Sequence, residues 1–256
     1  MPIGLFGKGV ARVTDILRSR ARRILELDDF VHLRRALIEL NDVQELKNVF
    51  GWTADPLLDD PGILDFRFVE DVNRRRVRDA ESLATVVRNI NPAACLDIGT
   101  GLGHSAALMA VNAPTARLYT VNVSPEDFGA AGTLTTVKLE KPQIGSYYRE
   151  RNLRNITQIL ANTAHWEPDI GCIDVAFIDG SHDCDFVIND TLKVLARMRP
   201  GSFVLWHDFN LSLIHNYPWI KSVCLGVEVL LARGALTGRV FHIRDSWVGV
   251  YRVADT

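Results

Sequence analysis

Three short segments place residues capable of chemistry directly after an apolar run: LDIGTGLGHS (96–105), FIDGSHD (177–183) and VLWHDF (204–209). Carboxylates and imidazoles can move protons or hold a metal ion, and closely spaced glycines let a backbone approach a ligand. The residues of interest are Asp97, Gly99, Gly101, Gly103, Asp179, His182, His207 and Asp208. They are the first candidates for a functional site.

The elements that must position these residues alternate between strand and helix from about residue 76. Helical patterns occur near 76–89, in HSAALMAVNA, near 186–196 and in WIKSVCLGVEVLLARG. The predicted strands are AACLDIG, RLYTVNV, ITQILAN, IDVAFID and SFVLWHD, followed by GRVFHI and WVGVYRV as a terminal hairpin. The first five are short apolar runs, typical of a parallel sheet covered on both faces.

This order predicts an α/β fold with a Rossmann-like, doubly wound, mostly parallel seven-stranded sheet and a terminal antiparallel hairpin. Ligands bind beyond the carboxyl ends of parallel strands in such sheets. Because the candidate residues follow strand ends, we expect them to meet at one edge of the sheet.

Residues 1–75 have a different pattern. Two amphipathic helices are predicted, one with its apolar stripe between Val10 and Leu25 and one between Leu33 and Val49. The segment GWTADPLLDDPG (51–62) is predicted to be a connecting loop. We expect 1–75 to form a helical cap or dimerisation region, giving a possible homodimer, and 76–256 to form the domain with the site. The arginines of the first helix would also suit an anionic membrane surface, although any solvated helix face has this pattern.

Composition points to a small-molecule ligand. The 256 residues are 47% hydrophobic, enough for a sizeable core, and the formal net charge of -2 gives no support to a nucleic-acid partner. Four scattered cysteines without a CxxC pair indicate reduced thiols rather than a zinc site. No apolar run reaches the ~20 residues of a membrane span, and no signal peptide is recognisable. We therefore expect a cytoplasmic protein without stable membrane insertion.

The glycine-rich segment alone is ambiguous. Read from Gly101, it matches the dinucleotide pattern G-x-G-x-x-A with Ala106 in the third place, so an NAD-type site is an alternative. Asp97 argues against a pyrophosphate, because a carboxylate at that point would repel it. A ligand with a cationic amine fits the acidic residue better.

Four motifs in this order resemble those of class I S-adenosylmethionine-dependent methyltransferases: LDIGTGLGHS, the polar strand end in YTVNV, FIDGSHDCDFVIND and RPGSFVLWHD. The resemblance is to the subgroup whose fourth strand ends in IDG-x-H and fifth in His-Asp, and it covers roughly 76–253. It implies S-adenosylmethionine as cofactor, held by Asp97, Gly99, Gly101, Gly103, Asn122, Asn162 and Asp179. Asn122 departs from the family pattern, which has an acidic residue gripping the ribose.

The resemblance also implies methyl transfer to a small-molecule acceptor, most simply a hydroxyl oxygen of a natural product, sugar or lipid-like compound. Asp179 and His182 would be catalytic, with His182 as general base because imidazole titrates near neutral pH. Related enzymes bind a divalent cation such as Mg²⁺ at these strand ends, which makes Asp179, His207 and Asp208 candidate ligands. Phe209 stands where catechol-type enzymes have an asparagine ligand, leaving His207 or Asn210 to complete the set.

Two other functions stay open at this point: an NAD-type dinucleotide-dependent oxidoreductase, and a non-catalytic module that keeps the fold. The segment 124–150 is either a lid over the acceptor or a structural loop with an embedded helix. Trp166 and Trp206 line an acceptor pocket or belong to the core.

Overall fold

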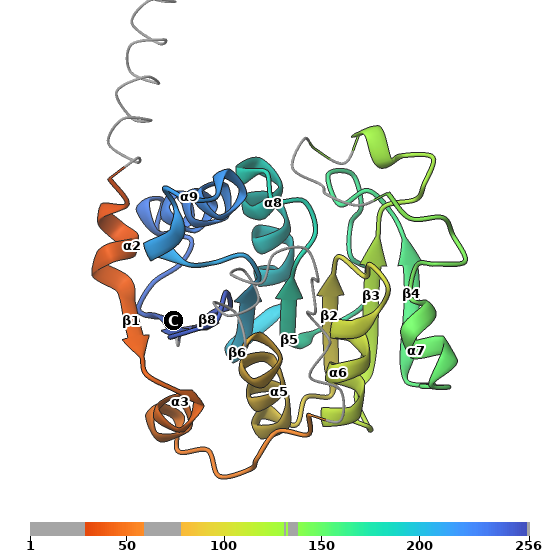
Figure 1. Cartoon of the computed structure of the whole chain (residues 1–256), viewed down its shortest axis with the longest axis horizontal. Helices are drawn as coiled ribbons and strands as arrows, with labels where there is room; N and C mark the ends of the chain where they lie inside the picture. Colours follow the sequence, from red (N-terminus) through yellow and green to blue (C-terminus); the bar gives the residue numbers. More distant parts are fainter. Residues whose placement is uncertain (1–28, 59–77, 131, 133–137, 255–256) are drawn as a thin grey trace, which may run out of the picture.

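A computed structural model describes residues 29–58, 78–130, 132 and 138–254. Its eight-stranded sheet has the order β1-β7-β8-β6-β5-β2-β3-β4 (Figure 1). Every neighbouring pair is parallel except those made by β8, which runs antiparallel between β6 and β7. The strands are β1 (Leu37–Leu40), β2 (Ala94–Ile98), β3 (Arg117–Asn122), β4 (Ile156–Leu160), β5 (Ile173–Ile178), β6 (Met198–Trp206), β7 (Val240–Ile243) and β8 (Gly249–Arg252). The predicted mostly parallel sheet with a terminal antiparallel hairpin is confirmed.

Helices cover both faces of this sheet (Figure 1). The core on one face includes residues of α8 and α9, and the core on the other includes residues of α3, α5 and α6. The helices are α2 (Val31–Ala36), α3 (Val43–Phe50), α5 (Asp79–Ile90), α6 (His104–Asn112), α7 (Ser146–Glu150), α8 (Cys184–Leu195) and α9 (Pro218–Ala232), with 3-10 turns at Phe128–Ala130 and Leu211–Leu213. Among the described residues no helix is long and apolar enough to cross a bilayer.

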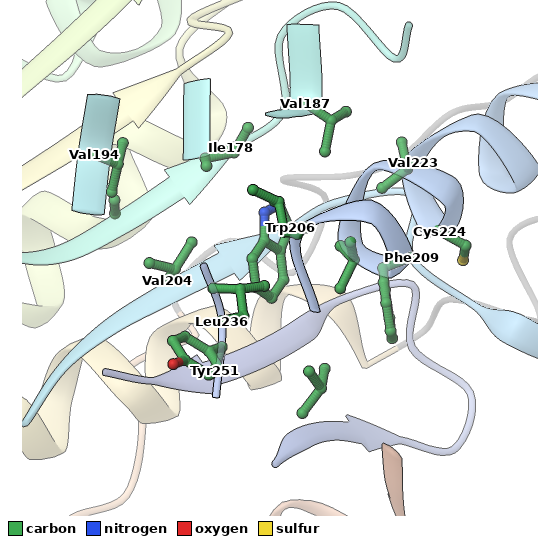
Figure 2. Packing of buried hydrophobic residues seen from close by; sticks show 14 of the residues in the cluster. Ile178, Val187, Val194, Val204, Trp206, Phe209, Val223, Cys224, Leu236 and Tyr251 are labelled. Carbon is green, nitrogen blue, oxygen red and sulfur yellow. The ribbon is translucent and has the colours of Figure 1, made fainter. Parts of the chain in front are cut away.

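The central strands are buried on both sides, which explains their unbroken apolar sequences. Alternate residues enter opposite cores. Val204 and Trp206 pack toward the α8 and α9 side (Figure 2). Phe203 and Leu205 pack toward α5 and α6. Trp206 is fully buried and donates its indole N–H to the hydroxyl of Thr191 at 2.9 Å. It belongs to the core, as does the partly buried Trp166, which packs against the same cluster.

The eighth strand is a difference from the seven predicted. Leu37–Leu40 lies within the stripe predicted to be one helix, but it forms β1 and pairs in parallel with Val240–Ile243. A new helix, α3, then begins after Asp42, whose Oδ1 accepts from the N–H of Glu45 at 3.0 Å. The prediction of a single helix between Leu33 and Val49 is therefore wrong, because pairing with β7 outweighs local periodicity.

Several other predictions concern residues only partly described. The first predicted helix, between Val10 and Leu25, lies outside the described residues, as does the second part of the loop 51–62. The boundary near residue 75 also falls in an undescribed range and stays a prediction. Within 124–150 the structure contains the embedded helix α7.

Candidate active site

The loop after β2 lies against the end of β5. Gly99 has φ +105°, and a Cβ there would fall 1.9 Å from the backbone oxygen of Asp179. Only glycine permits this approach. The N–H groups of Gly99 and Thr100 donate to the carbonyl of Val121 at 2.8 and 3.1 Å, which fixes the loop beside the end of β3. The glycine loop therefore packs directly against the end of β5.

Asp97 lies beneath this loop and is fully buried. The hydroxyl of Thr120 donates to its Oδ2 at 2.5 Å, whereas its Oδ1 has no hydrogen-bond partner in the described part of the chain. Burial raises the pKa of Asp97 to about 7, and the hydrogen bonds from the side chains of Thr120 and Ser105 only partly oppose this shift. A buried acceptor without a donor is suited to a cationic group brought by a ligand.

The two predicted asparagines hold loops at the same edge. The Oδ1 of Asn122 accepts from the N–H of Gly101 at 3.0 Å, so its carboxamide supports the glycine loop. The Oδ1 of Asn162 accepts from the N–H of Ala164, and its Nδ2 donates to the carbonyl of Ala130, both at 3.0 Å. Both residues lie at strand ends as expected, and their contact with a cofactor stays a prediction.

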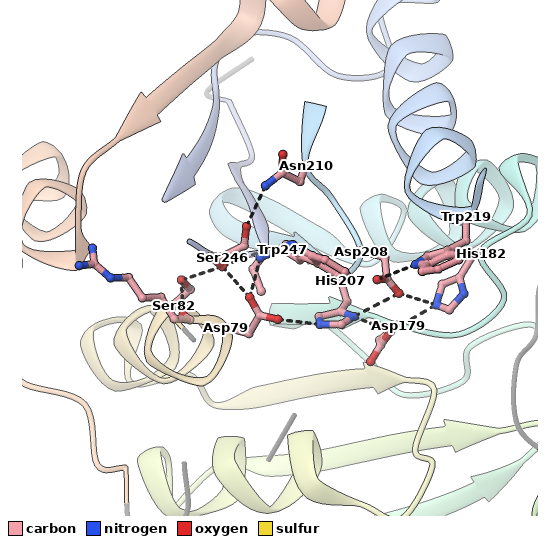
Figure 3. A network of polar contacts seen from close by, with 12 residues as sticks. Asp79, Ser82, Asp179, His182, His207, Asp208, Asn210, Trp219, Ser246 and Trp247 are labelled. Atoms are coloured by element: carbon pink, nitrogen blue, oxygen red, sulfur yellow. Dashed lines mark hydrogen bonds and ion pairs between the residues drawn. The ribbon is translucent and has the colours of Figure 1, made fainter. Parts of the chain in front are cut away.

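A cluster of two carboxylates and an imidazole follows β5 and β6 (Figure 3). His182 Nε2 lies 3.0 Å from Asp208 Oδ2 and 3.6 Å from Asp179 Oδ1. One ligand atom from each of these residues lies within 4.8 Å of the others, a separation that a single metal ion can bridge. Among the residues that the structure describes, neither buried ring nitrogen of His182 has a properly aligned hydrogen-bond partner, despite the short distance to Asp208. We name Asp179, His182 and Asp208 the acid–histidine cluster.

His207 lies behind this cluster with both ring nitrogens facing carboxylates. Its Nδ1 is 3.2 Å from Asp179 Oδ1 and 3.4 Å from Asp208 Oδ2, and its Nε2 is 3.0 Å from Asp79 Oδ2. Ionised carboxylates only accept hydrogen bonds, so this geometry favours a proton on each nitrogen. Such a ring has no free lone pair for a metal. His182, which was predicted as a base and not as a metal ligand, is better placed than His207 to complete the set with Asp179 and Asp208.

The other suggested ligand, Asn210, is oriented toward the β7–β8 turn. Its Oδ1 accepts from the N–H and hydroxyl of Ser212, and its Nδ2 donates to the carbonyl of Ser246 at 3.3 Å. Its carboxamide therefore fastens the chain after β6. Asn210 is not among the residues that form the acid–histidine cluster.

The charges in the cluster stabilise one another. Burial opposes ionisation of Asp179 and Asp208, but the two histidines outweigh it and lower both pKa values, that of Asp208 strongly. Burial likewise opposes the charge on the histidines, yet the carboxylates raise the pKa of His182 to about 10 and that of His207 well above its ordinary value. Without another cation, His182 therefore keeps its proton at neutral pH and cannot act as a base.

Two further polar residues at the site were not found from the sequence. Asp79, the first residue of α5, contacts His207, and the indole N–H of Trp219 donates to Asp208 Oδ1 at 3.2 Å (Figure 3). An acidic residue at a helix start and a tryptophan after Pro218 are both common in ordinary helices. Neither carries a signal in the sequence that distinguishes it from a structural residue.

Comparisons with known proteins agree with this geometry. Residues 96–209 match a family model described as a methyltransferase domain, a range that includes the glycine loop and the acid–histidine cluster. No curated protein sequence matches the chain.

Solved structures share the fold at low sequence identity. The O-methyltransferase TomG from Streptomyces achromogenes, in complex with SAM, is 16% identical with a TM-score of 0.52, covering 87% of this chain and 99% of its own. The SAH-bound methyltransferase PaMTH1 from Podospora anserina is 14% identical with a TM-score of 0.53, covering 85% and 99%. A putative O-methyltransferase from Klebsiella pneumoniae is 18% identical with a TM-score of 0.52, covering 83% and 96%. Residues 96–209 therefore match a methyltransferase domain, and the chain shares its fold with solved O-methyltransferases, one of them in complex with SAM.

Proposed function

We propose that the protein transfers a methyl group from S-adenosylmethionine to an oxygen of a small-molecule acceptor. One observation carries the proposal: Gly99 of the glycine loop is in direct contact with the backbone of Asp179, the first residue of the acid–histidine cluster. A cofactor on the loop would therefore present its methyl group next to groups that can hold or deprotonate an acceptor. The solved O-methyltransferases with the same fold support oxygen as the accepting atom.

The residues at the loop fit this cofactor. S-adenosylmethionine brings a cationic amine and a sulfonium but no phosphate, and the unpaired Oδ1 of the buried Asp97 is an acceptor of the right charge. The glycine loop would let the ligand approach the backbone, with Asn122 and Asn162 at the neighbouring strand ends. The bound cofactor supplies a methyl carbon activated by sulfonium, so the protein needs to align the acceptor and control its proton.

The acid–histidine cluster fits a divalent cation. It offers two carboxylates and one imidazole, and the buried nitrogens of His182 have no aligned partner within the described ranges. An imidazole ligand favours a softer ion than Mg²⁺, and the two carboxylates also suit Mn²⁺. When bound, such an ion would lower the pKa of an acceptor hydroxyl and orient it.

The role of His182 depends on the charge around it. Its pKa of about 10 reflects the two carboxylates, and a cation that compensates them would let the ring lose its proton. His182 would then bind the cation through Nε2, which faces Asp179 and Asp208, or accept the proton of the acceptor hydroxyl. One nitrogen cannot do both at the same time. His182 stays our candidate for the base, with Asp179 beside it.

Calorimetric titration of the purified protein with S-adenosylmethionine and S-adenosylhomocysteine, with NAD as control, tests the cofactor. We expect micromolar binding of the first two, no heat with NAD, and at least tenfold weaker S-adenosylmethionine binding by Asp97→Asn. Binding of NAD alone would indicate an oxidoreductase. Binding of none of the three would indicate a module that keeps the fold without the activity.

Manganese binding, followed by the electron paramagnetic resonance signal of free Mn²⁺, tests the cluster. We expect His182→Gln to weaken binding at least tenfold, because it removes the imidazole ligand. His215→Gln is the matched control, since His215 is exposed and outside the cluster. Equal affinities in all three proteins would exclude His182 as a ligand.

A further inference from the structure

Asp79 is a fully buried carboxylate whose two oxygens face different parts of the molecule (Figure 3). Its Oδ1 accepts from the hydroxyl of Ser246 at 2.9 Å and from the N–H of Trp247 at 2.5 Å, both in the turn between β7 and β8. Its Oδ2 faces His207 Nε2 at 3.0 Å. One oxygen therefore holds the turn, and the other holds a ring that borders the acid–histidine cluster.

His207 lies between Asp79 and the acid–histidine cluster. The side chain of His207 is 2% exposed, and its Nδ1 faces Asp179 and Asp208. The ring of Phe177 lies against it with centroids 5.9 Å apart. The charged groups that face the ring are thus Asp79 on one side and the two cluster carboxylates on the other.

We propose that Asp79 is a positioning residue of the active site, which acts through His207 to hold Asp179 and Asp208 in the geometry that the cluster needs. The carboxylates of Asp179 and Asp208 each have an oxygen within 4.8 Å of the other. Two ionised carboxylates this close repel each other unless a hydrogen-bond donor lies between them. His207 Nδ1 is that donor, and its direction is set by the bond that Asp79 makes to the opposite nitrogen. Carboxylates that hold the far nitrogen of a functional imidazole fix its orientation in the same way.

This inference deepens the proposed function, since it concerns the same cluster, but its test requires no methyl transfer. The competing explanation is that Asp79 only fastens the β7–β8 turn to the start of α5. The two oxygens of Asp79 allow the explanations to be separated. In Asp79→Asn the amide oxygen is needed by Ser246 and Trp247, so the amide nitrogen faces His207 and the acceptor for Nε2 is lost.

Three matched variants accompany Asp79→Asn. Ser246→Ala removes a donor on the Oδ1 side and leaves the contact with His207. Glu228→Gln alters another fully buried carboxylate, which accepts from the N–H of Leu33 at 2.6 Å and lies outside the site. His207→Gln leaves Asp79 in place and removes the ring through which it acts.

The first measurement is the nuclear magnetic resonance spectrum of metal-free protein carrying ¹⁵N-labelled and ¹³C-labelled histidine. Signals of His207 and His182 are assigned by their loss in His207→Gln and His182→Gln. We expect Asp79→Asn to lose the protected Nε2–H signal of His207 and to shift the Cε1–H signal of His182, while Ser246→Ala and Glu228→Gln retain both. An unchanged His182 signal in Asp79→Asn would overturn the inference.

The second measurement is manganese affinity. We expect Asp79→Asn and His207→Gln to bind Mn²⁺ about 10-fold to 100-fold more weakly, the usual effect of losing a residue that orients a metal site. Affinity within twofold of the original protein in either variant would overturn the inference.

If the original protein does not bind Mn²⁺, the metal in the proposed function is wrong, and the histidine signals alone decide the role of Asp79. If Asp79→Asn does not fold, His207→Gln decides it. An unchanged His182 signal in that variant excludes action through His207.

Discussion

The backbone carbonyl of Asp179 occupies the space that a side chain on residue 99 would need. This contact joins the two halves of the site, because the loop after β2 and the end of β5 cannot separate without changing the position of the cluster. The sequence shows the glycine and the aspartate but not their contact, which depends on the pairing of β2 with β5.

Gly99→Ala should therefore damage both stability and cofactor binding. We expect it to lower the free energy of unfolding by about 3 kcal/mol, combining steric overlap with a positive φ. Gly101→Ala is the control: φ is +52°, but no atom of the described residues lies within 4 Å of the added Cβ, so a loss of about 1 kcal/mol is expected. Urea unfolding measures both, and equal losses would contradict the contact with Asp179.

The buried carboxyl of Asp97 should make stability depend on pH. Its pKa is about 7 in the folded protein against an ordinary 3.8, so folding favours the protonated form. The stabilisation is complete below pH 4 and is lost as pH rises to about 7, a change on the order of 4 kcal/mol. Urea unfolding without cofactor should show this fall between pH 4 and 8 in the original protein and not in Asp97→Asn. Parallel pH profiles for the two proteins would show that Asp97 ionises freely in the fold.

Among the elements, α3 shows how the chain starts a new helix after β1. Asp42 Oδ1 accepts from the N–H of Glu45 at 3.0 Å, and Glu45 Oε2 accepts from the N–H of Asn41 at 2.8 Å, which together form a reciprocal cap.

Asp42→Ala should lower the free energy of unfolding by about 1 kcal/mol, because it leaves a helix N–H without its acceptor. Hydrogen exchange should accelerate in the first turn of α3. Asn48→Ala, near the other end of the same helix, controls for helix propensity and should leave that exchange unchanged. Unaltered exchange in Asp42→Ala would show that packing alone holds the helix start.

The central strands could be predicted from the sequence and β1 could not. Both outcomes follow from how many residues of each strand are buried. β2 is buried at all five positions, and that double-sided burial appears directly as an apolar run. β1 is buried only at Leu40, so its sequence shows a half-apolar pattern that also fits a helix. Its partner β7 lies near the other end of the chain, where local patterns carry no information.

The candidate site, like the sheet, could be predicted only in part from the sequence. Asp179, His182 and Asp208 stand in motifs at strand ends, and parallel pairing brings them together as expected. The orientation of His207 was not predictable, because it depends on Asp79 from a helix at the start of the domain. Side-chain direction inside a buried polar network is a property of tertiary structure.

At the scale of the whole molecule, three distant parts of the chain meet at the β7–β8 turn. The N–H of Arg244 donates to the carbonyl of Leu40 at the end of β1, and the N–H of Arg78 donates to the carbonyl of Asp245. His242 Nε2 lies 2.7 Å from the carbonyl of Ser246. The N-terminal part, α5 and the C-terminal hairpin therefore support the site together.

A chain that starts at residue 42 lacks β1 and α2, whereas one that starts at residue 29 retains both. We expect the shorter chain to self-associate in sedimentation velocity as its concentration rises, with faster hydrogen exchange in Val240–Ile243. The longer chain should show no such concentration-dependent self-association beyond that of the full protein, and Val240–Ile243 should exchange as they do in the full protein. Identical sedimentation and exchange of the two truncated chains would contradict this expectation.

The shorter chain is expected to self-associate because β1 pairs with β7 and its removal leaves β7 unpaired on that side. A strand with unpaired backbone groups is a template for adding further strands from other molecules, and proteins commonly protect such strands with a short cover. The four residues of β1 are that cover for the C-terminal hairpin. A fragment cut to the predicted domain, residues 76–256, would expose β7 as an open edge, and its aggregation would be mistaken for the native assembly of the protein.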